Sequence, residues 1–396
     1  MRRAGTSLIT LIVFLAGAGA IMLAQTLSSR YSGAAAESAD SKMFGAPPAE
    51  IFHEDYDGPP VVGDNVTRAP ALAPLQPGNR THQVRMDIVA AEIEIAPDVR
   101  YQAWTFGSTV PGPVVHVRQG DRVIFTMKNR SDEKVSVTPP EKGASPFLAA
   151  LAQDRLQKVA PVVAPMHHSM DFHAGTVAPD DKWRMVMPGE TIRMEWVANY
   201  PGVYLYHCGA PPILMHLAMG QYGVVVVSPR DGFETDGEVD REFVVVQSEF
   251  YLKPGDGEDG LYVLDFDKAL EKNPSHVAFN GHTQALTETP LIANAGDRVR
   301  MYFHNVGPSD TSSFHVVGAI FDRVFYEGNP RNDWAGMQTV AFGASNGGVV
   351  EFIAPEEGKY ILVDHEFADA HRGAVGYLQV RSRGGELTRN LPPMTH

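Results

Sequence analysis

Short apolar stretches, rich in β-branched and aromatic residues and bounded by Gly, Pro or Asp, recur along most of the chain. This pattern is typical of strands joined by turns. The pattern also repeats, because residues 119–129 (QGDRVIFTMKN) return as 295–305 (AGDRVRMYFHN), 201–207 return as 357–365, and 220–226 return as 373–380. The repeat predicts an all-β protein of two tandem Greek-key β-sandwiches, residues 83–232 and 240–385, with 386–396 as a C-terminal tail.

One segment departs from the strand pattern. Residues 146–158 (PFLAALAQDRLQK) carry apolar side chains at helical spacing among good helix formers, which predicts a short helix. The segment lies in a long insertion, residues 133–164, within the first predicted domain. The insertion could cover a functional site or serve only as a packing flap, and the sequence leaves both interpretations open.

The first residues have the features of an export signal. Met-Arg-Arg is followed by an apolar run from Leu8 to Leu23. A basic start and a short apolar core predict that residues 1–28 are a signal peptide or an uncleaved membrane anchor. Residues 29–82 are rich in Ala, Pro, Gly and Asp without periodicity, so we interpret them as a linker and N-terminal arm. The body of the protein is therefore expected to be periplasmic or otherwise exported.

Charge and cysteine content narrow the class of function. The formal net charge of −14 argues against nucleic-acid binding, which needs a basic surface. The same charge would steer a basic electron-donor protein, but it is equally a means of solubility. The only cysteine, Cys208, excludes a disulfide within the chain.

The candidate chemistry gathers around this cysteine. His207 directly precedes Cys208, and His216 follows eight residues later. A lone cysteine is most often a small buried apolar residue. Here, however, five of the 15 histidines lie between residues 167 and 216. One thiolate with two imidazoles is the trigonal set that binds copper in electron-transfer sites, so we predict a metal site.

Strand geometry divides these residues between two sites. Neighbouring side chains on an extended strand point to opposite faces, so His207 and Cys208 are predicted to bind different metal ions. An odd spacing separates His168 from His173 in the same way. One face then collects His168, Cys208 and His216. The other face collects His173 and His207, and it still needs a third ligand.

Six short motifs occur in order along the chain: residues 168–174 (HSMDFHA), 206–208 (YHC), 215–218 (MHLA), 274–281 (PSHVAFNG), 312–318 (SSFHVVG) and 362–365 (LVDH). With these motifs, residues 83–385 resemble the copper-containing nitrite reductases, a family of two-domain cupredoxins in the multicopper oxidase superfamily. Any one motif alone would be weak, whereas six in the right order are specific.

The resemblance implies a homotrimer with one type 1 and one type 2 copper per subunit. It implies type 1 ligands His168, Cys208 and His216. It implies type 2 ligands His173 and His207, with His315 of a neighbouring subunit, and the catalytic residues Asp171 and His276. An electron from a donor protein, a cupredoxin or a cytochrome c, would pass through type 1 copper and Cys208–His207 to type 2 copper, where nitrite becomes nitric oxide.

One departure from the family concerns the axial ligand of type 1 copper. The family has a methionine five residues after the second type 1 histidine, and this chain has Gln221 there. Glutamine is a known axial alternative, and its harder oxygen is expected to lower the reduction potential. Met219 is the alternative axial ligand.

Other classes of function make different demands on the sequence. A laccase-like multicopper oxidase needs His-x-His pairs and a His-Cys-His sequence, but Gly209 follows Cys208 and no His-x-His occurs. A copper electron carrier or storage protein would leave His173, His207 and His315 unexplained. A reductase of the same scaffold that acts on another small oxidant, such as oxygen or hydroxylamine, stays open.

Overall fold

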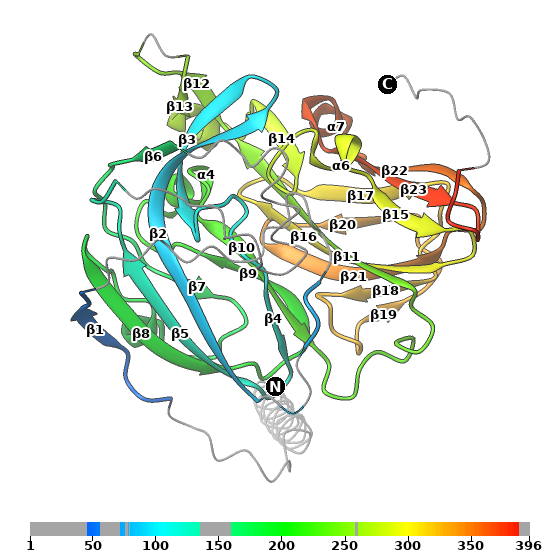
Figure 1. The fold of residues 1–396 in the computed structure, drawn as a ribbon, viewed down its shortest axis with the longest axis horizontal. Helices are drawn as coiled ribbons and strands as arrows, with labels where there is room; N and C mark the ends of the chain where they lie inside the picture. The colour runs from blue at the N-terminus through cyan, green and yellow to red at the C-terminus, as the bar shows by residue number, and fades with distance from the viewer. Residues whose placement is uncertain are drawn as a thin grey trace, which may run out of the picture. The chain divides into compact units, whose positions relative to one another are not determined.

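The computed structural model describes residues 46–55, 72–75, 78, 80–134, 160–257 and 260–387 (Figure 1). The predicted leader (1–28), the predicted helix (146–158) and most of the C-terminal tail lie outside these residues. Within the described ranges, no helix has the length and apolar character needed to cross a membrane.

Two sheets build the first sandwich. The larger sheet has the strand order β1-β8-β5-β2-β3-β13-β12, with β6 paired to β2. Its strands are β1 (Glu50–His53), β2 (Thr81–Ala96), β3 (Val99–Phe106), β5 (Arg122–Asn129), β6 (Ala160–Val162), β8 (Glu190–Val197), β12 (Leu252–Pro254) and β13 (Tyr262–Leu264). The smaller sheet, in the order β4-β10-β9-β7, contains β4 (Val115–Arg118), β7 (Asp171–Phe172), β9 (Gly202–His207) and β10 (Tyr222–Ser228).

Two further sheets build the second half (Figure 1). One, in the order β14-β11-β16-β21-β18-β19, contains β11 (Arg241–Phe250), β14 (His276–Phe279), β16 (Arg298–Gly307), β18 (Arg323–Tyr326), β19 (Asp333–Trp334) and β21 (Asn346–Ile353). The other, in the order β15-β23-β22-β17-β20, contains β15 (Leu291–Asn294), β17 (Ser312–Val317), β20 (Thr339–Phe342), β22 (Gly358–Asp364) and β23 (Val375–Arg381). The described helices are short: α3 (Pro179–Lys182), α4 (Ile213–Ala218), α5 (Phe266–Leu270), α6 (Ala285–Glu288) and α7 (Phe367–Arg372).

The sequence repeat corresponds to a repeat of strand pairings. The parallel pair β2/β5 has its counterpart in β11/β16, and the parallel pair β4/β10 in β15/β23. The antiparallel pair β9/β10 has its counterpart in β22/β23. The predicted all-β class, with two related β-sandwiches, is therefore confirmed.

Among the described residues, three large clusters of buried apolar side chains hold the sandwiches together. One fills the first sandwich around Phe125 and Tyr206, and another fills the second sandwich around Phe303 and Phe314. A third joins the two halves, since it contains Val203 of β9 together with residues of β10, β11 and β16. Strand β9, whose last residue is His207, is therefore buried against both halves.

The polypeptide chain crosses very close to β9 at Gly328. The backbone N–H of Val203 donates to the Glu327 carbonyl oxygen at 2.9 Å. Gly328 has a φ of +72°, and a Cβ there would lie 2.7 Å from the Val203 nitrogen. Only glycine meets both conditions without strain, so the position of β9 is fixed by backbone contact as well as by side-chain packing.

Glu249 is a buried carboxyl group near the end of β11, only 3% exposed. It accepts hydrogen bonds from the Tyr251 hydroxyl and from the backbone N–H groups of Ser309 and Asp310. Burial raises the pKa of Glu249 to about 7, because the carboxylate loses its hydration.

This pKa predicts that stability depends on pH through Glu249. Between its ordinary pKa of 4.5 and about 7, the folded chain keeps a proton that the unfolded chain releases. The free energy of unfolding should therefore fall by roughly 3 kcal/mol as pH rises through this window. Urea denaturation at a series of pH values measures this slope. Glu249→Gln should make the slope shallower and the exposed Glu238→Gln should not, whereas equal slopes in all three proteins would contradict the prediction.

Candidate metal centres

Cys208, His168 and His216 bring their ligand atoms together in the first sandwich. Cys208 directly follows β9, and His216 lies on α4. The Cys208 Sγ lies 3.2 Å from the His216 Nδ1 and 3.9 Å from the His168 Nδ1, and the two Nδ1 atoms are 3.3 Å apart. All three side chains are fully buried. The group offers one sulfur and two imidazole nitrogens to one point, a donor set that suits copper.

Gln221 supplies a fourth donor to this group. Its Oε1 lies 3.0 Å from the His216 Nδ1, and the residue is fully buried. The Met219 sulfur, in contrast, accepts a hydrogen bond from the Tyr101 hydroxyl at 3.3 Å. Between these two residues lies Gly220, whose φ of +107° turns the chain after α4. The geometry thus favours Gln221 over Met219 as the residue that faces the group.

Burial sets the protonation of these side chains. It lowers the pKa of His168 to about 3 and also lowers the pKa of His216, so both imidazoles are neutral, as metal ligands must be. Burial raises the pKa of the Cys208 thiol to about 11. The Ser169 N–H points at the sulfur at 3.3 Å and provides a partial positive charge. A bound cation would stabilise the thiolate further, because its positive charge adds to that of the Ser169 N–H.

Asp171, His173 and His207 form a second group on the other side of β9. The Nε2 atoms of His207 and His173 are 3.1 Å apart, and Asp171 Oδ2 lies 3.7 Å from the His207 Nε2. The His207 Nδ1 lies 2.8 Å from the Cys208 carbonyl oxygen, so it carries the proton and leaves Nε2 free to bind a metal. Burial, and then the neighbouring His207, lower the pKa of His173.

His315 and His276 lie in the second sandwich, outside both groups. His315 is on β17 and is half-buried, and His276 begins β14. Among the described residues, neither metal-ligand group includes them. Burial, followed by the nearby charge of Lys268, lowers the pKa of His276. One chain therefore brings together two histidines and one carboxylate of the second group, but not the predicted third histidine.

Two ring contacts of predicted ligands were missed by the sequence reasoning. Trp104 packs its ring against His168 and His216, with centroid distances of 5.4 and 4.9 Å. His365 packs against His315 with a centroid distance of 4.9 Å. Trp104 carries no spacing signal. His365 does belong to one of the six motifs, but nothing in that motif indicates which ring it contacts.

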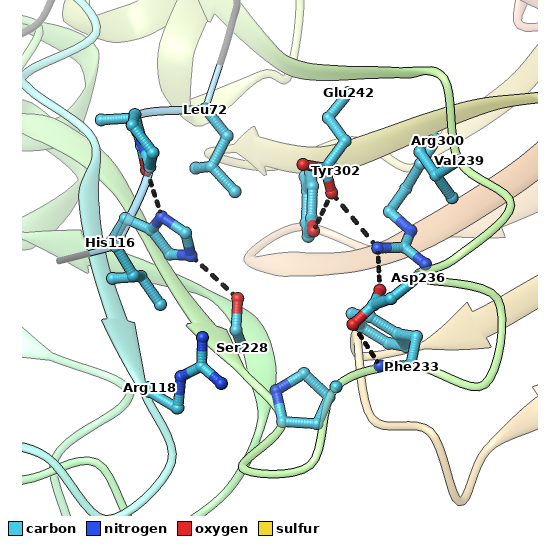
Figure 2. Close-up of a pocket in the computed structure, with 15 residues that line it drawn as sticks. Leu72, His116, Arg118, Ser228, Phe233, Asp236, Val239, Glu242, Arg300 and Tyr302 are labelled. Carbon is cyan, nitrogen blue, oxygen red and sulfur yellow. Dashed lines mark hydrogen bonds and ion pairs between the residues drawn. The ribbon is translucent and has the colours of Figure 1, made fainter. Parts of the chain in front are cut away.

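A polar cavity of about 290 Å³ lies where the two halves meet. Figure 2 shows that its polar side chains turn toward one another. Arg300 pairs with Asp236 and Glu242, while Tyr302 donates to Glu242 and the His116 Nε2 lies 2.8 Å from the Ser228 Oγ. The lining contains no member of either metal-ligand group. The cavity is therefore best explained as part of the junction between the sandwiches.

The chain is similar to known copper proteins over most of its length. The multicopper oxidase family matches residues 88–139 and 155–231. The copper-containing nitrite reductase of Neisseria meningitidis is 35% identical over 326 residues, which cover 81% of this chain and 75% of that protein. The enzyme of the same name from Cereibacter sphaeroides is 30% identical over 335 residues, 78% of each chain.

A solved structure extends the similarity to three dimensions. The copper nitrite reductase of Nitrosomonas europaea superposes with a TM-score of 0.62 at 32% sequence identity. The match covers 76% of this chain and 95% of that one.

Proposed function

The chain belongs to the copper-containing nitrite reductases, and we propose that it reduces nitrite to nitric oxide through a type 1 and a type 2 copper in each subunit. The observation that carries this proposal is the pair of donor groups at the end of β9, which a single peptide bond joins. A carrier or a storage protein would need only the group that contains Cys208. The reductase uses both.

The ligand assignment follows the two groups. His168, Cys208, His216 and the axial Gln221 would hold type 1 copper, and His173, His207 and His315 would hold type 2 copper. Bound copper would supply a one-electron relay at the first position and an open coordination site for nitrite at the second. The backbone from Cys208 to His207 is the covalent link between the two positions.

Protons would come from the side chains beside nitrite. The reaction combines nitrite, one electron and two protons and yields nitric oxide and water. Asp171, close to the His207 Nε2, can hold a proton and pass it to a nitrite oxygen. His276 would provide the second proton donor, because an imidazole exchanges protons near neutral pH. The bond that breaks is the one between nitrogen and the protonated oxygen, which leaves as water.

A neighbouring subunit is needed to complete the second site. His315 and His276 both lie in the second sandwich, away from His173 and His207. A homotrimer in which each second sandwich faces the first sandwich of the next subunit would bring them together. The reduced donor would be a cupredoxin or a cytochrome c, and the apolar leader supports export to the periplasm, with or without a retained membrane anchor.

Nitric oxide formation is the direct test of the reaction. Copper-loaded protein with nitrite and a reduced artificial donor should produce nitric oxide. His276→Ala should lower the rate by about 100-fold or more, since a proton donor is lost. His282→Ala, a histidine of the same segment without an assigned role, is the matched control. If the protein binds both coppers but forms no nitric oxide, oxygen and hydroxylamine would be the substrates to test next. Full activity of His276→Ala would refute the role of His276 as a proton donor.

The axial assignment predicts a change of reduction potential. Gln221→Met replaces a hard oxygen by a soft sulfur, which favours Cu(I), so the type 1 potential should rise by at least about 60 mV, a tenfold change in the electron-transfer equilibrium. Redox titration of the thiolate–copper absorption measures it, and Cys208→Ala, which should abolish that absorption, assigns the signal. An unchanged potential in Gln221→Met with a shift in Met219→Leu would transfer the axial role to Met219.

A further inference from the structure

His315 is held at its Nδ1 atom by the backbone. Its Nδ1 is hydrogen-bonded to the Gln338 carbonyl oxygen, which can only accept, so Nδ1 carries the proton. The Nε2 is then the atom with a free lone pair, as a ligand from this histidine requires. One hydrogen bond still allows the ring to tilt about its Cβ–Cγ bond.

The face of the His315 ring is covered by His365. The two ring centroids are 4.9 Å apart, with an angle of 30° between the planes. Phe367 supports His365 from another direction, edge to face, at 5.0 Å and 81°. Phe367 is 68% exposed, and a large aromatic side chain held at the surface is of little use to the core of this sandwich. The three rings form a row that ends on His315.

A buried carboxylate fixes the backbone that carries this row. Asp364 is fully buried, and its Oδ1 accepts hydrogen bonds from the N–H groups of Ser313 at 2.8 Å and Glu366 at 2.9 Å. Its Oδ2 accepts from the Gln247 Nε2 at 2.6 Å. The N–H of His365 donates to the Ser313 carbonyl oxygen at 2.9 Å. Asp364 therefore ties the end of β22 to β17, the strand of His315.

We infer that His365 is a positioning residue for His315, with Phe367 as its support. The inference rests on the proposed role of His315 as a type 2 copper ligand of the neighbouring subunit. The hydrogen bond to Gln338 fixes one atom of the imidazole, and the His365 ring fixes its plane. With both restraints the Nε2 points outward in one direction before the subunits meet, so less freedom is lost when copper binds.

The test measures type 2 copper affinity in the full-length, copper-loaded protein. Chelator competition gives the affinity, and electron paramagnetic resonance gives the type 2 signature. His365→Ala should weaken type 2 copper binding by about tenfold, the usual effect of losing a supporting contact, and should change the type 2 spectrum. His365→Phe keeps an aromatic ring and should stay within about threefold of the parent. The type 1 absorption should be unchanged in both, which shows that the first sandwich is intact.

Two further variants make the result decisive. Phe367→Ala alters an exposed side chain, so it should fold like the parent and weaken type 2 binding by about threefold, even if His365→Ala does not fold. His371→Ala, an exposed histidine on α7, is the control and should change nothing. Parent-like affinity in His365→Ala or Phe367→Ala, or equal loss in His365→Ala and His365→Phe, would overturn the inference. Retention of the type 2 spectrum in His315→Ala would overturn the ligand assignment instead.

Discussion

The alternation of side chains at the end of β9 is the constraint on which both metal-ligand groups depend. His207 and Cys208 are adjacent, so the extended backbone sends one to each side, and no other spacing joins two sites by so short a covalent path. His207 and Cys208 stay on opposite sides only if the strand cannot twist or slide. Strand β9 is paired with β7 and β10, its inner residues belong to the apolar cluster between the halves, and Gly328 lets the opposite backbone approach Val203.

In the second sandwich, the residue that corresponds to Cys208 serves a structural purpose. Strands β9 and β22 begin at Gly202 and Gly358, and six residues later come Cys208 and Asp364. Both side chains are fully buried. The thiol faces two imidazoles, whereas the carboxylate accepts hydrogen bonds from the Gln247 amide and from backbone N–H groups, so the buried side chain is a candidate metal ligand in one copy and a structural anchor in the other. The repeated fold thus keeps the position at the end of this strand buried while the side chain at that position differs between the copies.

Strand patterns and the parity of residue spacings were enough to predict the all-β fold and the division of the candidate residues around Cys208 into two groups, because backbone geometry fixes both. They left Gln221 and Met219 as alternatives, since the side-chain directions after α4 depend on the turn at Gly220. They could not reveal the contacts of Trp104 or His365, because rings that meet across strands depend on tertiary register. The predicted helix at 146–158 remains a prediction outside the described residues, and the proposed role of His315, which would need a second copy of the chain, also remains a prediction.

Strands β12 and β13 follow β11 in sequence yet join the large sheet of the first sandwich, where β13 pairs with β3. An edge of the first sandwich is thus formed by residues that follow β11, the first strand of the second sandwich. A fragment that stopped between the two repeats would expose the edge of β3, and such an unpaired edge invites association with other chains. The two copies of the repeat are therefore not independent units of the fold, because the first takes an edge strand from residues that follow the first strand of the second.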